Sequence, residues 1–463
     1  MMRPWIWSIA GIVALSASNA STVSADGWKA GTARAAITPK EPTWMAGYAA
    51  RTAPSKGALH DIWAKALVLE DAGGKRALLI TLDVCGIDAT VSGRIRKAIV
   101  EKQRIPLESI ALACSHTHSG PVLGSNLITM YKLAPDQSER IRAYTEEFVD
   151  QVIGVAARAV EALEPADVDW GRGFADFAVN RRENAEPKVV ELKSKLMLRG
   201  PVDHDVPVLR VRSKSGAEKA IVCGYACHCT VLDGYEINGD YAGFAQIAIE
   251  KAHPGAQAMF VAGCGADQNP QPRRKVEMAE RHGSSLAHAV EEALAGPMRP
   301  VGASFGSAYE EIPLAFASLP TPEEIEKQTT DANFYIASRA KMLKKTIAEQ
   351  GKLSPTYPYP VQAWVLGGGE ISWIFLGGEV VVDYALRLKR NLGAGHTWVT
   401  AYANDVPAYI PSLRVLEEGG YEGGGAMVYY GRPASWSKDV EESIVASVGR
   451  MLKAAWAEVP ASH

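Results

Sequence analysis

Short apolar segments alternate with amphipathic ones along nearly the whole chain after residue 28. A first strand is predicted near residue 29. Continuous apolar runs follow it, and such runs are typical of strands buried on both faces. They fall at 63–69, 76–82, 110–114, 206–212, 220–229, 258–262, 363–366, 371–376 and 398–403. Segments with helical periodicity fall at 91–102, 139–163, 244–251, 275–295, 380–392 and 440–457. This alternation predicts an α/β fold, with a mixed β-sheet core covered by helices in a single large domain.

Two stretches break the pattern. Residues 169–205 are rich in loop-forming positions and contain Asn180-Arg181-Arg182. The stretch 321–350 is charged and polar, which predicts one or two solvated helices. We therefore expect a polar cap or insertion within 320–360.

The N-terminus differs from the rest of the chain. Arg3 is the only charged residue before Asp26, and an apolar run leads to small residues that end at Ala25. This pattern predicts a signal peptide over 1–25, so that the mature domain of 26–463 is exported, either periplasmic or secreted. The apolar run is too short to be read as a membrane span, and a retained N-terminal anchor is the alternative.

Bulk charge argues against a polyanionic partner. The 463 residues contain 49 Lys and Arg against 52 Asp and Glu, and the formal net charge is −3. No basic field for nucleic acid follows from this balance, and we expect neither nucleic-acid binding nor a transmembrane span in the mature chain. The six cysteines lie mostly in apolar runs without the C-x-x-C spacing of a metal or redox motif, which favours buried free thiols.

Two histidines follow the apolar run 110–114, at His116 and His118. If the strand continues to His118, both side chains project from the same face because strand side chains alternate. Such a pair suits a metal ligand beside a proton-transfer group. The alternative is a structural pair that only hydrogen-bonds the backbone.

Further chemistry-bearing residues follow other apolar runs. His228 ends one run, and the alternation turns its neighbours Cys227 and Cys229 away from it. Glu379 follows a Gly-Gly turn at the expected start of a helix, where a carboxylate would also complement the helix dipole. Tyr421 lies in a glycine-rich turn.

Taken together, these segments resemble the neutral, non-lysosomal ceramidase family over about 30–435. The resemblance rests on Ser-His-Thr-His-Ser-Gly-Pro at 115–121 and on the order of the later motifs: an Asn-Arg pair, a strand ending in His, a Gly-Asp-x-x-Gly turn at 239–243, a Gly-Glu turn, a Tyr-Ile pair and Tyr-Glu-Gly at 421–423. By this resemblance, the ligands of one Zn2+ per chain are His116, His228, Glu379 and Tyr409. The catalytic residues are His118, Arg181 and Tyr421.

The resemblance implies an exported, zinc-dependent amidohydrolase that cleaves an N-acyl amide bond by metal-activated water. Ceramide or a related N-acyl lipid is the default substrate, which implies transient contact with a membrane surface. In this scheme His118 moves a proton, Arg181 holds the polar head or carbonyl of the substrate, and Tyr421 helps zinc to stabilise the oxyanion.

Three departures from the family keep other substrates open. Asn269 stands where the family has a serine, so a serine nucleophile is not supported. We also expect no immunoglobulin-like domain after the catalytic domain, and 321–359 contains no apolar lid. The alternatives are a zinc hydrolase of the same scaffold acting on a smaller polar N-acyl, ester or carbohydrate-type substrate, and a non-catalytic metal-binding periplasmic protein.

Overall fold

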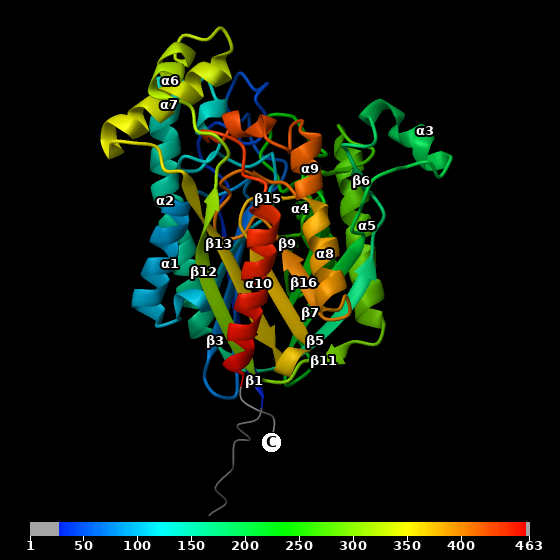
Figure 1. Cartoon of the computed structure of the whole chain (residues 1–463). Coiled ribbons are helices and arrows are strands. Elements are labelled where there is room, and N and C mark those ends of the chain that lie inside the picture. The colour runs from blue at the N-terminus through cyan, green and yellow to red at the C-terminus, as the bar shows by residue number, and fades with distance from the viewer. Residues whose placement is uncertain (1–26, 460–463) are drawn as a thin grey trace, which may run out of the picture.

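The computed structural model describes residues 27–459 (Figure 1), and the predicted signal peptide lies outside them. The larger sheet has the strand order β4-β3-β2-β1-β5-β7-β8-β9, with β11 paired to β5. Its inner strands are antiparallel, while β3–β4 and β8–β9 are parallel. The strands are β1 (Trp28–Ala36), β2 (Trp63–Glu70), β3 (Arg76–Leu82), β4 (Ile110–Cys114), β5 (Glu164–Phe174), β7 (Asp205–Ser213), β8 (Glu218–Tyr225), β9 (Gln257–Ala262) and β11 (Arg299–Pro300).

A second sheet packs face to face on the first. Its strand order is β12 (Phe305–Ala315), β13 (Thr356–Leu366), β14 (Ile371–Leu376) and β16 (Thr397–Thr400). Alternate residues of both sheets form one buried cluster, in which Trp373 and Trp398 stack with ring centroids 4.0 Å apart. Such sheet-on-sheet packing interdigitates the inner side chains of both layers.

Helices cover the outer faces of both sheets (Figure 1). On the large sheet, α2 packs against β1 and β2, and α5 packs against β5 and β7; on the second sheet, α10 packs against β12 and β13. The helices are α1 (Ala89–Gln103), α2 (Pro135–Glu161), α3 (Val189–Ser194), α4 (Asp240–Ala252), α5 (Val276–Ala295), α6 (Pro322–Gln328), α7 (Phe334–Gln350), α8 (Val382–Leu392), α9 (Leu413–Glu418) and α10 (Val440–Ala457). The predicted mixed β-sheet core covered by helices is confirmed.

The sequence prediction missed some strands. β12 is absent from it because glycine, proline and a Glu-Glu pair interrupt its apolar positions. β5 continues to Phe174, into the stretch predicted as loop-rich. Conversely, the predicted strand 220–229 ends at Tyr225, before His228.

The candidate site residues predicted from the sequence lie together at one end of the molecule. β4 and β9 lie at opposite ends of the strand order, yet they contact each other. An isolated parallel bridge joins Thr117, after β4, to Cys229, after β8. Two small sheets complete this end: β6 (Ala178–Asn180) with β10 (Gln268–Pro270), and β15 (Glu379–Val380) with β17 (Tyr409–Ile410).

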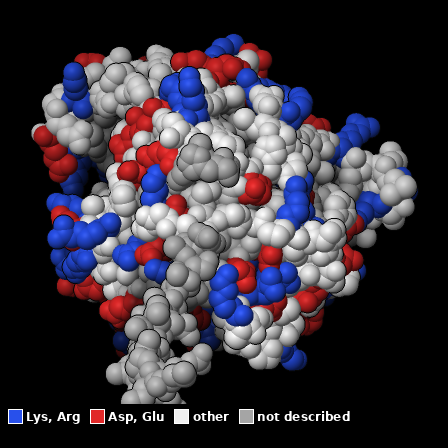
Figure 2. All heavy atoms as spheres, turned by 90° about the horizontal axis from the view of Figure 1, so that it is seen from below, with Lys and Arg blue, Asp and Glu red and all other residues white. Residues whose placement is uncertain are grey.

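The polar stretch forms α6 and α7, which project at the upper end in Figure 1 and pack on each other around a small core of Ile325, Ala340 and Leu343. Tyr335 of α7 contacts Tyr429 edge to face at 4.9 Å. The opposite face carries interspersed positive and negative side chains (Figure 2). Within 27–459, no helix has the length and apolarity needed to cross a membrane.

Candidate metal centre and its cleft

The two histidines after β4 meet through a turn, so the condition that the strand continues to His118 is not met. β4 ends at Cys114, and His116 has a φ of 60°, in the left-handed region. The backbone N–H of His116 donates to the carbonyl of Val84, and that of His118 donates to the carbonyl of Cys229. These bonds hold the turn so that His118 Nε2 lies 3.0 Å from His116 Nε2.

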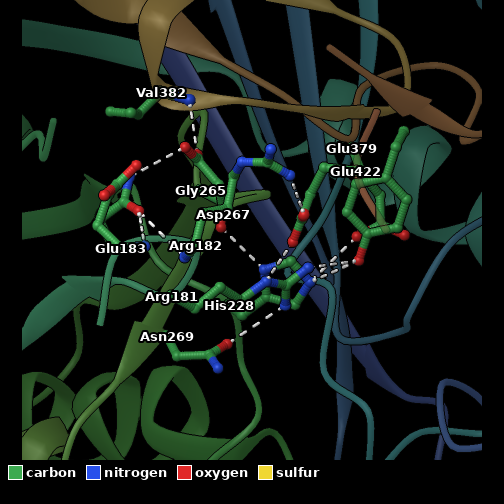
Figure 3. Close-up of polar contacts among 12 residues, drawn as sticks. Arg181, Arg182, Glu183, His228, Gly265, Asp267, Asn269, Glu379, Val382 and Glu422 are labelled. Carbon is green, nitrogen blue, oxygen red and sulfur yellow. Dashed lines mark hydrogen bonds and ion pairs between the residues drawn. The ribbon is translucent and has the colours of Figure 1, made fainter. Parts of the chain in front are cut away.

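Glu379 lies between two histidines. Its Oε2 is 3.0 Å from His116 Nε2 and 3.0 Å from His228 Nε2, and Tyr430 donates its hydroxyl proton to Oε1. Glu379 belongs to β15, before α8 begins at Val382, so the expected position in the first helical turn is wrong. The carboxylate is buried and points to the histidines (Figure 3).

Hydrogen bonds to the backbone set the tautomers of both histidines. His116 Nδ1 is 2.6 Å from the carbonyl oxygen of Cys85, and His228 Nδ1 is 2.8 Å from that of Gly265. A carbonyl only accepts, so each Nδ1 carries a proton, and each Nε2 is the ring nitrogen left to face Glu379 and to bind a cation.

Three potential ligand atoms therefore converge in a buried place: the two Nε2 atoms and Glu379 Oε2, which lies 3.0 Å from each of them. These ligand atoms lie within 4.8 Å of one another. Two imidazoles with backbone-fixed Nδ1–H groups and one carboxylate form the donor set of many zinc sites. The arrangement fits a divalent cation.

The charges of the cluster also favour a bound cation. Burial alone would raise the pKa of Glu379, but His116 and His228 hold it well below its usual range. Burial disfavours a charge on His116, yet Cys85 and Glu379 raise its pKa to about 10. Burial, with the Arg181 charge, lowers the pKa of His228 to about 4. Without a cation, His116 is therefore protonated and positively charged beside Glu379. A bound cation would replace the proton on His116 Nε2.

Tyr409 adds its hydroxyl oxygen to the cluster as a fourth potential ligand atom. The parallel pairing of β15 and β17 places it opposite Glu379. Its hydroxyl lies 3.3 Å from His228 Nε2 and accepts a hydrogen bond from Arg181 Nη2 at 3.1 Å. Burial raises the pKa of Tyr409 well above its usual value, whereas the Arg181 guanidinium favours the phenolate.

Arg181 connects the cluster to the cleft wall (Figure 3). Its Nε donates to Glu422 Oε1 at 2.7 Å, and its Nη1 lies 3.4 Å from Asn269 Oδ1. The pairing of β6 with β10 puts Asn269 beside it. Burial would lower the pKa of Arg181, but Tyr409 and Glu422 raise it well above its usual value, so Arg181 is a permanent cation.

A cleft of about 670 Å³ opens above the cluster. His118, Arg181, Tyr409 and Tyr421 all line it, so the residues predicted to act on substrate face one space. Tyr421 is 42% exposed and lies edge to face on Tyr409, with ring centroids 5.2 Å apart. Burial of the His118 ring, with His116 and His228 nearby, lowers its pKa well below the usual value, so His118 is neutral and can accept a proton.

Several neighbours of the cluster could not be predicted from sequence motifs. Tyr430 contacts Glu379, and Tyr402 stacks on His116 with ring centroids 4.3 Å apart; neither lies in a recognisable motif. Cys85 forms a second possible metal group with His116 and His118. However, its Sγ approaches His116 at Nδ1, the atom already bonded to a carbonyl. The six cysteines are buried and free, as predicted.

Gly47 is the neighbour on which His118 depends. It has a φ of 90°, and a Cβ added there would lie 2.3 Å from His118 Nδ1. We expect Gly47→Ala to displace the imidazole and to lower the rate of any reaction that uses His118 for proton transfer about 100-fold, without loss of metal binding by the cluster, since a misplacement of about 1 Å can cost that much.

Gly74→Ala is the matched control, because Gly74 has a similar φ of 83° with nothing within 4 Å of the added Cβ. Activity assays and metal analysis of both variants check the expectation. Equal losses of activity would mean that backbone strain, and not the position of His118, is responsible.

Comparisons with known proteins agree on one family. The family model for neutral/alkaline non-lysosomal ceramidase, N-terminal, matches residues 28–270. Neutral ceramidase A of Dictyostelium discoideum is 26% identical over 253 residues, which are 51% of this chain and 34% of that protein. Neutral ceramidase B of the same organism is 26% identical over 227 residues, 45% of this chain and 31% of the relative. The chain thus spans about a third of the length of these curated relatives.

Solved structures extend the likeness in fold. The neutral ceramidase of Pseudomonas aeruginosa superposes with a TM-score of 0.71 at 20% identity, covering 94% of this chain and 76% of that one. A ceramidase complexed with C2 gives a TM-score of 0.72 at 17% identity, covering 95% and 76%. The family match covers more than half of the chain and includes His116, Arg181 and His228, and the chain therefore belongs to the neutral/alkaline non-lysosomal ceramidase family.

Proposed function

We propose that this protein is an exported, metal-dependent amidohydrolase that cleaves an N-acyl amide bond. His116, His228, Glu379 and Tyr409 would hold one Zn2+, in a catalytic domain of 26–463. The observation that carries the proposal is the convergence of two imidazole Nε2 atoms on one carboxylate oxygen, next to His118 and Tyr409, which line the cleft.

When bound, the cation would act as a Lewis acid and lower the pKa of a water molecule toward neutrality. The side chains around it divide the remaining work. Neutral His118, 3.0 Å from His116 Nε2 and facing the cleft, would take a proton from the attacking water and give it to the departing nitrogen. The proton thus ends on the amine product, and the hydroxyl ends on the carboxylic acid.

Arg181 and Tyr421 would act on the acyl carbonyl. The Tyr421 hydroxyl would donate to the developing oxyanion, which is the kind of interaction that is strongest in the transition state. Arg181 would hold Tyr409 in place and orient the polar part of the substrate, since its guanidinium already bonds the Tyr409 hydroxyl and Glu422. Asn269 cannot serve as a nucleophile, which favours attack by water.

Relatives named neutral ceramidase make ceramide or a related N-acyl lipid the first substrate to test. The single decisive experiment is hydrolysis of a fluorescent ceramide and of short N-acyl amines, with and without a chelator. We expect hydrolysis to stop when the metal is removed and to return when Zn2+ is restored. No side chain of the cluster could replace the cation as the Lewis acid that activates water.

The outcomes separate the alternatives. Hydrolysis that survives complete removal of metal would contradict the assignment of the cluster. Stoichiometric Zn2+ without turnover of any amide, ester or glycoside would instead identify a metal-binding protein without catalysis.

A further inference from the structure

The cleft above the cluster is lined by charged side chains and by three tyrosines, Tyr48, Tyr409 and Tyr421. Four arginines line it: Arg181, Arg182, Arg273 and Arg274. Val179 and Val189 are its aliphatic residues, and each is about 2% exposed, so neither presents much apolar surface. A cleft of this size in a lipid-binding protein would ordinarily be lined by hydrophobic side chains.

The charges on the wall are organised in ion pairs at both ends. Near the cluster, Glu422 accepts from Arg181 at 2.7 Å and from Arg182 at 2.8 Å. At the other end, Glu186 pairs with both Arg273 and Arg274. These networks fix the wall and leave no strong excess of either sign for a purely ionic ligand.

Several polar atoms of the wall have no partner among residues 27–459. They are Arg182 Nε, Arg273 Nε and the hydroxyl of Thr230, all buried and all on residues that line the cleft. A buried donor without a partner costs free energy unless a ligand or water satisfies it. The wall therefore holds polar groups that no described residue satisfies.

These features disfavour an alkyl chain. Burying methylene groups is favourable when the surroundings are apolar, but here a chain would lie against ion pairs and strip them of water, which is unfavourable. A hydroxylated or zwitterionic group would instead bond the wall.

We propose that the site selects N-acyl compounds with a short acyl group on a polar, hydrogen-bonding amine, in preference to long-chain, two-tailed lipids. This inference rests on the proposed amidohydrolase function and narrows its substrate class. Both N-acyl amino acids and N-acyl amino sugars have the required chemistry.

The test is kcat/KM for acyl chains of increasing length, from acetyl to palmitoyl, on three amines: an amino acid, a hexosamine and sphingosine. We expect at least a tenfold fall from acetyl to palmitoyl on each amine, and higher values for the polar amines than for sphingosine. A rise with chain length, or a preference for sphingosine, would overturn the inference and leave the amidohydrolase intact. No hydrolysis in any series would overturn the amidohydrolase function, and the inference with it.

A paired variant tests the wall directly. Arg273→Leu combined with Glu186→Leu removes both partners of an ion pair outside the catalytic groups, and Arg274, the second partner of Glu186, keeps its ion pair with Asp233. We expect the ratio of kcat/KM for the acetyl substrate to kcat/KM for the palmitoyl substrate to become at least threefold smaller in this variant. Arg94→Leu with Glu146→Leu, an exposed pair between α1 and α2, is the control and should keep the wild-type preference. An unchanged preference in the first variant would show that this wall does not select substrate.

Discussion

Glu379→Gln should abolish metal binding and, with it, hydrolysis. The substitution keeps the shape of the side chain but removes the charge that His116 and His228 face at 3.0 Å. The two imidazoles and the neutral Tyr409 hydroxyl would bind a divalent cation weakly without the carboxylate, so metal content should fall from one ion per chain to a small fraction. Activity should fall by at least about 1,000-fold, since metal catalysis supplies several kcal/mol of transition-state stabilisation.

The measurement is metal content by mass spectrometry beside activity, after dialysis against Zn2+. Glu422→Gln is the matched control, because Glu422 is also buried beside the cleft but bonds Arg181 and Arg182 and not the cluster. It should keep its metal. Full metal in Glu379→Gln would show that the cation, if present, is held elsewhere.

Fold class was predictable here because core periodicity is strong. The runs 76–82 and 110–114 became β3 and β4 with the predicted bounds. The sequence does not show that a second sheet covers one face of the first, because sheet-on-sheet contacts form between residues far apart in the chain. The mixed pattern of β12 does not identify it as a strand in the sequence, and its strand conformation depends on pairing with β13.

The residues of the candidate site were found through the family motifs, and the structure brings all seven to one place. The reason for their proximity was not predictable. His116 reaches Glu379 through a left-handed residue in a turn, a conformation that histidine adopts only occasionally. Tyr430 and Gly47 act through contacts between distant segments, for which single-sequence patterns carry no signal.

The site and its cleft have different characters. The cluster is built from the residues that the ceramidase family motifs carry, whereas the wall around it is ionic. A buried metal centre sets the kind of bond that can be cleaved, and the wall sets what can approach it. Similarity to ceramidases therefore says more about the reaction than about the acyl chain.

Tyr421→Phe should separate catalysis from metal binding. Tyr421 lies on Tyr409 and lines the cleft, but it makes no contact with His116, His228 or Glu379 in the hydrogen bonds of the described residues. Loss of its hydroxyl should therefore leave the metal content at one ion per chain. We expect kcat to fall about 100- to 1,000-fold, the usual cost of removing one oxyanion donor.

Little change is expected in KM, because the lost hydrogen bond would strengthen only as charge develops on the carbonyl oxygen. Tyr429→Phe is the control: its ring lies 6.0 Å from that of Tyr421, and it does not line the cleft. Steady-state kinetics with metal analysis of both variants decide the question. A rise in KM with unchanged kcat would assign Tyr421 to substrate binding, and metal loss would place it among the ligands.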